Sequence, residues 1–227
     1  MVYQPSPRQL SALKALLLAI SCIPLAHLGY GAWTDGLGAN PIEAITRGLG
    51  IWALNFLLLT LSVSPLRKLS GWHWLLRLRR QLGLTCFAYA LLHFLTYVWL
   101  DQFFDITSMA KDVLKRPFIT VGFSAFVLLL PLAATSSNWA IRQLGGARWQ
   151  QLHRSVYLIA ILAVAHYLWL VKRVALLDPI IYALILTGLL GWRVLERLRQ
   201  YSRFRPLPNR RRPPLVQPVT FMQRPDQ

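Results

Sequence analysis

Long apolar runs are the feature that most limits what this chain of 227 residues can fold into. A helix needs roughly 20 mostly apolar residues to cross the hydrocarbon of a bilayer. Six segments approach that length: 10–33, 48–66, 82–100, 118–134, 152–171 and 179–192, the last extendable to 198 by snorkelling arginines. Because lipid offers no partner to backbone N–H and C=O groups, such segments must be helical. We therefore expect an all-α integral membrane protein, a bundle of six transmembrane helices.

The composition supports this interpretation and excludes an ordinary soluble domain, since 55% of the residues are hydrophobic and only 15% are charged. The first segment resembles a secretory signal, because Arg8 and Lys14 precede its apolar core. Its length and the lack of a clear small-x-small cleavage site favour a membrane span. Cys22 and Cys86 lie inside apolar runs and are typical of small apolar residues, not of a disulfide or metal framework.

The formal charge of +17 first suggests nucleic-acid binding, but the distribution of the charges predicts a membrane topology instead. With the N-terminus inside, the cytoplasmic segments hold 19 of the 25 Lys and Arg residues, and the outer loops hold six of the eight acids. The positive-inside rule then places both termini in the cytoplasm. We expect the basic side to contact lipid headgroups and no nucleic acid.

Two regions of different composition follow from this topology. Residues 1–200 form the predicted six-helix domain. Residues 201–227 are rich in Pro and Arg, cannot bury a core, and are expected to be a disordered cytoplasmic tail on anionic lipid.

Two histidines inside the apolar runs are the candidate functional residues. His93 lies 11 residues after Leu82, so roughly 17 Å along the third span. His166 lies 13 residues after His153, so roughly 20 Å along the fifth span, which runs in the same direction. The two imidazoles are therefore expected at similar depth in the outer half of the membrane. Facing each other across a gap between helices, they could bind the iron of one heme.

The face of the third span that carries His93 is also polar and aromatic, which predicts that it turns into the bundle. Its members at helical spacing are Thr85, Tyr89, Thr96 and Tyr97.

The other histidines are weaker candidates. His153 lies at the inner end of the fifth span, about 140° in azimuth from His166 on a continuous helix. A second heme there would need a partner at the inner end of the third span, where Arg79 and Arg80 stand instead. His73 is interpreted as an interfacial side chain, and His27 as a structural one near the outer end of the first span.

Several stretches together resemble one known family. They are RRQLGLTCFAYALLHFLTY (79–97), RWQQLHRSVYLIAILAVAHYLW (148–169), the outer-loop GLGANPIE (36–43) and KRPFITVG (115–122). They look like the heme-binding membrane subunit of the periplasmic protein-methionine-sulfoxide reductase system, the MsrQ/YedZ family. That family belongs to the ferric-reductase-like transmembrane group, alongside NADPH oxidases. The resemblance extends over all six spans.

The resemblance implies a multi-pass protein of the bacterial inner membrane that binds heme b, with FMN associated with the family. It implies electron transfer from the quinone pool, or from a flavin reductase, to a periplasmic molybdopterin-containing reductase that repairs oxidised methionines. On its own such a subunit is not an enzyme. The family's heme ligands carry over onto His93, His153 and His166, of which His93 and His166 are the expected pair.

The sequence departs from its relatives in two ways. No cytosolic flavin and nicotinamide domain is visible, unlike in NADPH oxidases. The third span also lacks the inner histidine of two-heme relatives, which leaves one heme predicted and a second possible. The arginine run Arg77, Arg79, Arg80 could meet a lipid phosphate, which we favour, or a flavin phosphate.

Two other functions stay open. A ferric or cupric reductase would differ in its terminal acceptor. A proton-coupled transporter without heme would use the histidines as a proton relay.

Overall fold

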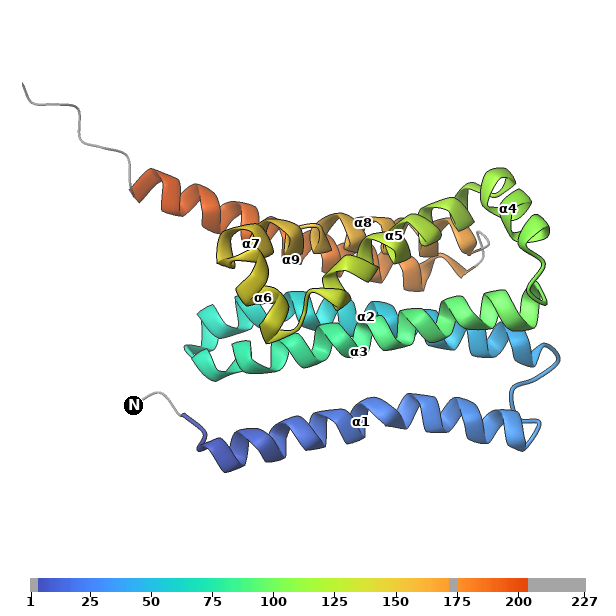
Figure 1. Cartoon of the computed structure of the whole chain (residues 1–227), viewed down its shortest axis with the longest axis horizontal. Coiled ribbons are helices and arrows are strands. Elements are labelled where there is room, and N and C mark those ends of the chain that lie inside the picture. The colour runs from blue at the N-terminus through green and yellow to red at the C-terminus, as the bar shows by residue number, and fades with distance from the viewer. Residues whose placement is uncertain (1–3, 172–174, 204–227) are drawn as a thin grey trace, which may run out of the picture. The chain divides into compact units, whose positions relative to one another are not determined.

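The computed structural model describes residues 4–171 and 175–203, and within these ranges all regular structure is helical, which confirms the predicted all-α class (Figure 1). The chain divides into two compact units, residues 1–193 and 194–227. The helices are α1 (Pro7–Trp33), α2 (Pro41–Ser70), the 3₁₀ turn η1 (His73–Leu75), α3 (Leu76–Thr96), the π-helical η2 (Tyr97–Asp101), α4 (Ile106–Lys115), α5 (Pro117–Ala134), α6 (Asn138–Leu144), α7 (Gly146–His153), α8 (Val156–Leu170) and α9 (Leu177–Arg203).

The six predicted membrane spans are confirmed in the described part of the chain. Six helical segments there are long and apolar enough to cross a bilayer: Pro7–Trp33, Pro41–Ser70, His73–Asp101, Pro117–Ala134, Gly146–Leu170 and Leu177–Ser202. Most extend beyond the predicted apolar runs, because helices continue into polar turns that hydropathy does not mark. Of the predicted tail, 201–227, the first three residues are the helical end of α9, and residues 204–227 lie outside the described part of the chain.

The fifth span is interrupted where we treated it as one continuous helix. The N–H of Arg154 is shared between the carbonyls of Gln150 and Gln151, at 3.1 and 3.2 Å. Ser155 donates to the Leu152 carbonyl through both its N–H and its hydroxyl. These tightened bonds end α7 at His153 and start α8 anew at Val156. The azimuth of 140° between His153 and His166 was stated for a continuous helix, so it does not describe this interrupted span.

Local sequence sets the ends of the spans. Three of them begin with proline in the first turn, where its missing N–H would have no helical partner anyway: Pro7, Pro41 and Pro117. Ser6 and Gln9 form a capping box at the start of α1. Gly71 ends α2 in a left-handed conformation, at φ 75°, which glycine adopts without a Cβ penalty.

The core is built from α2, α3, α5 and α8, with α2 packed on α3 and α5 packed on α8. Leu61 of α2 and Ala160 of α8 are fully buried, and Tyr182 of α9 donates a 2.8 Å hydrogen bond to Asn55 of α2. By contrast, α1 is mostly exposed. It is attached by a 2.5 Å bond from the Tyr89 hydroxyl to the Ser21 carbonyl, as expected for a helix that faces lipid on most sides.

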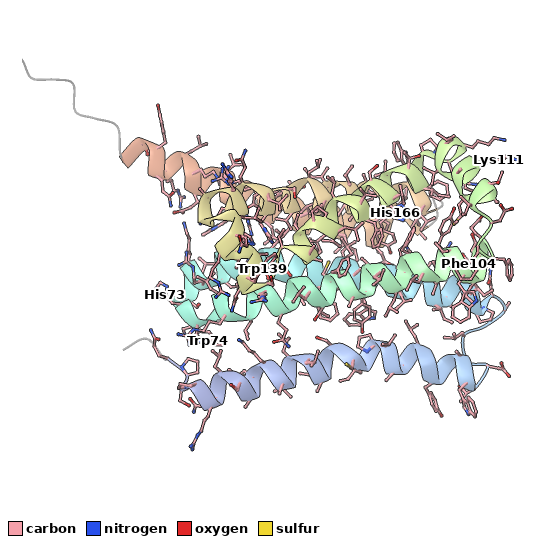
Figure 2. All side chains as sticks on the ribbon, viewed as in Figure 1. His73, Trp74, Phe104, Lys111, Trp139 and His166 are labelled. Carbon is pink, nitrogen blue, oxygen red and sulfur yellow. The ribbon has the colours of Figure 1, made fainter. Side chains whose placement is uncertain are left out.

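The first unit has two different ends. His73 and Trp139 lie toward one end, near η1 and α6, whereas Phe104 and Lys111 lie toward the other, beside α4 (Figure 2). We call them the basic end and the α4 end. The basic end carries Arg77, Arg79, Arg80, Arg142 and Arg148 on the segments that meet there.

Replacing Leu61 by alanine should destabilise the bundle by about 2–5 kcal/mol, because the side chain is 0% exposed and its loss leaves a cavity among packed helices. Leu59→Ala is the matched control, since Leu59 is 47% exposed and should cost about 0.5 kcal/mol or less. Reversible unfolding by sodium dodecyl sulfate in mixed micelles measures both. Equal losses in the two variants would contradict this assignment of the core.

Candidate functional site

The structure brings His93 and His166 together, as their matched depth predicted. His93 lies in the last turn of α3 and His166 near the end of α8. Their ring centroids are 6.3 Å apart, and the rings are inclined at 73°. Figure 2 shows His166 nearer the α4 end than the basic end. The π-helical turn Tyr97–Asp101 directly follows the helix that carries His93, and such turns are frequent at functional sites.

Each imidazole is held through its Nδ1 atom by a backbone carbonyl of the neighbouring helix. His93 Nδ1 lies 2.8 Å from the Thr46 oxygen of α2, and His166 Nδ1 lies 2.7 Å from the Phe118 oxygen of α5. A carbonyl can only accept, so in both rings Nδ1 must carry the proton and donate it. The lone pair of each neutral ring is then on Nε2, the atom available to bind a metal.

A glycine stands four residues after each of these carbonyls. A Cβ at Gly50 would lie 3.1 Å from the His93 ring, and a Cβ at Gly122 would lie 2.7 Å from His166 Nδ1. In a helix the carbonyl of residue i pairs with the N–H of residue i+4, so any side chain at that position stands beside the acceptor. Glycine therefore gives each imidazole the room to reach its carbonyl.

The pair fits a metal centre with two axial imidazoles. Two metal–nitrogen bonds of about 2 Å in line, with a ring radius at each end, give a centroid separation of roughly 6 Å, close to that observed. In the described ranges 4–171 and 175–203 no group of three or more His, Cys, Asp and Glu could hold a metal. The remaining coordination positions would thus come from a macrocycle such as heme.

Aromatic side chains surround the pair on the α5 side. The Phe118 ring lies 6.4 Å from that of His166. Phe94, next to His93, stacks on Phe126 at 4.6 Å and lies 6.0 Å from Phe123. Apolar rings beside a redox centre lower the local dielectric and limit access of water, two properties that tune its potential.

The polar stripe predicted beside His93 turns inward, but toward two different neighbours. The Thr96 hydroxyl donates to the His93 carbonyl at 2.8 Å and accepts from the Thr46 hydroxyl of α2 at 3.2 Å. Tyr89 is buried and bonds the Ser21 carbonyl of α1. Thr96 and Tyr89 therefore tie α3 to α2 and to α1, and Thr96 also supports the backbone that carries His93.

His153 is not part of this pair. It ends α7, stacks on Trp149 with centroids 3.9 Å apart, and has its Nδ1 at 3.1 Å from the Trp149 carbonyl. Its Nε2 is buried and has no hydrogen-bond partner among the described residues. His27 and His73 are exposed on α1 and η1.

Sequence reasoning missed both glycines and both carbonyl acceptors. A glycine inside an apolar helix costs about 1 kcal/mol relative to alanine and often marks a close approach, which is a usable signal. That signal does not say which side chain makes the approach, because this depends on how the helices pair.

Comparisons with known proteins agree with the geometry. Residues 49–164 match the family model described as "Ferric reductase like transmembrane component". A relative from Azospira oryzae named "Protein-methionine-sulfoxide reductase heme-binding subunit MsrQ" is 68% identical over 224 residues, which cover 99% of this chain and 95% of the relative. The chain belongs to the MsrQ family of ferric-reductase-like membrane proteins.

More distant members of the MsrQ family carry the same name. The relative from Herminiimonas arsenicoxydans is 54% identical over 86% of this chain and 89% of its own length. The relative from Caulobacter vibrioides is 46% identical over 89% of this chain and 96% of its own length. The family model covers Gly50, His93, Gly122 and His153 and ends two residues before His166. No solved structure matches this chain.

Proposed function

We propose that this chain is the heme b-carrying electron-transfer subunit of a protein-methionine-sulfoxide reductase system. The observation that carries the proposal is the facing pair His93 and His166, each with Nδ1 bound to a carbonyl and Nε2 left to ligate iron. The names of the relatives, heme-binding subunits of such a system, support it.

In this proposal the heme supplies one-electron oxidation and reduction. His93 and His166 would both hold the heme iron, and in this proposal the subunit passes electrons and is not an enzyme by itself. The Thr46 and Phe118 carbonyls fix the tautomer and orientation of the two rings and make Nε2 a stronger donor. The Phe118 ring beside His166 would limit the access of water to the centre.

The place of the pair along the bundle supports outward electron transfer. The positive-inside rule assigns the basic end to the cytoplasm and the α4 end to the periplasm, in a bacterial inner membrane. The pair lies nearer the α4 end (Figure 2). Electrons would enter from the quinone pool or a flavin donor, with FMN as an associated cofactor. They would leave to a periplasmic molybdopterin-containing reductase that repairs methionine sulfoxide.

For a second heme, the structure offers His153 as one ligand but no partner ligand on α3. The buried, unpartnered Nε2 of His153 is available as a ligand. The residue within electrostatic reach of it from α3 is Arg79, which offers cationic donors and no lone pair. We therefore propose one bis-histidine heme, with His153 as the remaining candidate ligand for another.

Removing either member of the pair should abolish the bis-histidine centre. We expect His93→Ala and His166→Ala to lower heme per protein at least about tenfold, because one axial bond is lost. His153→Ala is the control and should keep the reduced spectrum of the pair. The reduced-minus-oxidised spectrum and pyridine hemochrome quantitation measure this. Full retention in both single variants would refute the pairing, and a colourless wild-type protein would favour a proton relay.

Filling the space beside one imidazole should have a similar effect without touching a ligand. Gly122→Ala places a Cβ 2.7 Å from His166 Nδ1, so the bond to the Phe118 carbonyl must break or lengthen. We expect heme affinity to fall about 10- to 100-fold. Gly188→Ala is the matched control, because a Cβ there meets nothing within 4 Å. Equal heme retention in the two alanine variants would contradict the role of Gly122.

The orientation is tested by reporter fusions. Alkaline phosphatase, active only in the periplasm, should be active when fused after Asp105 at the α4 end and inactive at the C-terminus. Green fluorescent protein at the C-terminus should fluoresce. An active C-terminal phosphatase would reverse the orientation and with it the direction of electron transfer.

A further inference from the structure

A second cluster of functional groups lies toward the basic end, away from the histidine pair. It consists of Arg79 on α3, Tyr157 on α8 and Arg193 on α9, all partly buried in the first unit. Arg193 donates from Nη1 to the Tyr157 hydroxyl and from Nη2 to the Leu61 carbonyl at 2.6 Å. Its guanidinium carbon also lies 4.8 Å from the centre of the Tyr157 ring. Arg79 is close enough for its charge to interact with both Arg193 and Tyr157.

The cluster concentrates positive charge in a part of the first unit whose own sequence holds no acid. Residues 44–100 and 113–177, which include α3 and α8, contain no Asp or Glu. Glu196 follows on α9 in the second unit, where its Oε1 accepts from Gln200. The acceptors of Arg193, a phenol and a carbonyl, are neutral, and its buried Nε has no hydrogen-bond partner among the described residues.

A bound anion would stabilise two neighbouring arginines that are partly buried in a segment without acids. Removing like charges from water without a counter-charge is costly, and planar guanidinium groups match the oxygens of phosphate. The Tyr157 hydroxyl accepts from Arg193, so its own proton is free to donate to a further oxygen. Basic sites between transmembrane helices at the cytoplasmic face are typical places for acidic lipid headgroups.

We propose that Arg79, Arg193 and Tyr157 form a binding site for a phosphate group at the basic end of the bundle. The phosphate belongs to an acidic phospholipid or to a soluble phosphate ion. Either source offers the same oxyanion to the two guanidinium groups. The site does not depend on the heme between His93 and His166.

The test uses the full-length protein, purified in mild detergent and stripped of lipid by exchange. Native mass spectrometry measures the binding of dioleoylphosphatidylglycerol against dioleoylphosphatidylcholine, and isothermal titration calorimetry measures the binding of inorganic phosphate. We expect Arg79→Gln and Arg193→Gln each to weaken binding of one phosphate ligand at least about tenfold, since each removes a charged donor. Selective loss of phosphatidylglycerol binding identifies the lipid as the source, and selective loss of inorganic phosphate binding identifies the soluble ion.

Arg77→Gln is the matched control, because Arg77 is an exposed arginine on the same turn region of α3 and should leave binding unchanged. Arg193→Lys keeps the charge and Tyr157→Phe keeps the ring, so each should weaken binding less than Arg193→Gln does. These two variants still test the site if Arg193→Gln does not fold. Wild-type binding to neither ligand, or equal binding by wild type, Arg79→Gln and Tyr157→Phe, would overturn the proposal. So would loss of heme from Arg79→Gln with phosphate binding unchanged, because the cluster would then hold heme carboxylates. Absence of heme from the wild type would refute the proposed function and leave this site standing.

Discussion

A polar ring nitrogen inside an apolar helix bundle needs a hydrogen-bond partner, and the way this bundle supplies one organises the rest of the structure. An unpaired polar group in hydrocarbon costs several kcal/mol, roughly. The Nδ1 atoms of His93 and His166 find theirs in the carbonyls of Thr46 and Phe118, which already serve a helical N–H. A carbonyl has two lone pairs and can accept twice. The second bond fixes the tautomer and leaves the lone pair of Nε2 available to bind a metal.

The same arrangement, a backbone carbonyl followed four residues later by a glycine, occurs in two helix pairs. Helix α2 supplies Thr46 and Gly50 to the histidine of α3, and α5 supplies Phe118 and Gly122 to the histidine of α8. In each pair the glycine-bearing helix packs closely against the histidine-bearing one, because small residues let membrane helices approach. The buried core shared by these four helices holds the two helix pairs against each other, and the imidazole centroids are then 6.3 Å apart.

The two ends of the bundle differ in their electrostatics. Near the α4 end the pair consists of neutral imidazoles with Phe118 beside His166, and the ion pairs Arg47–Glu43 and Arg116–Asp112 each join residues four apart in the sequence. Toward the basic end the acceptors of Arg193 within the first unit, the Tyr157 hydroxyl and the Leu61 carbonyl, are neutral. A membrane protein can keep such charge where acidic lipid is at hand, and this makes the basic end the natural place for an anion.

The sequence alone determined the class of fold and the candidate pair, whereas helix packing decided how the site is built. Apolar length predicts spans because the bilayer has a fixed thickness, and the constant helical rise predicts that His93 and His166 share a depth. Neither property fixes which helices touch or which way a side chain points. The roles of Gly50 and Gly122, the carbonyl acceptors, the break after His153 and the contacts of Arg193 all depend on azimuth and on pairing between helices distant in sequence. These are set by packing and close approach, which hydropathy does not encode.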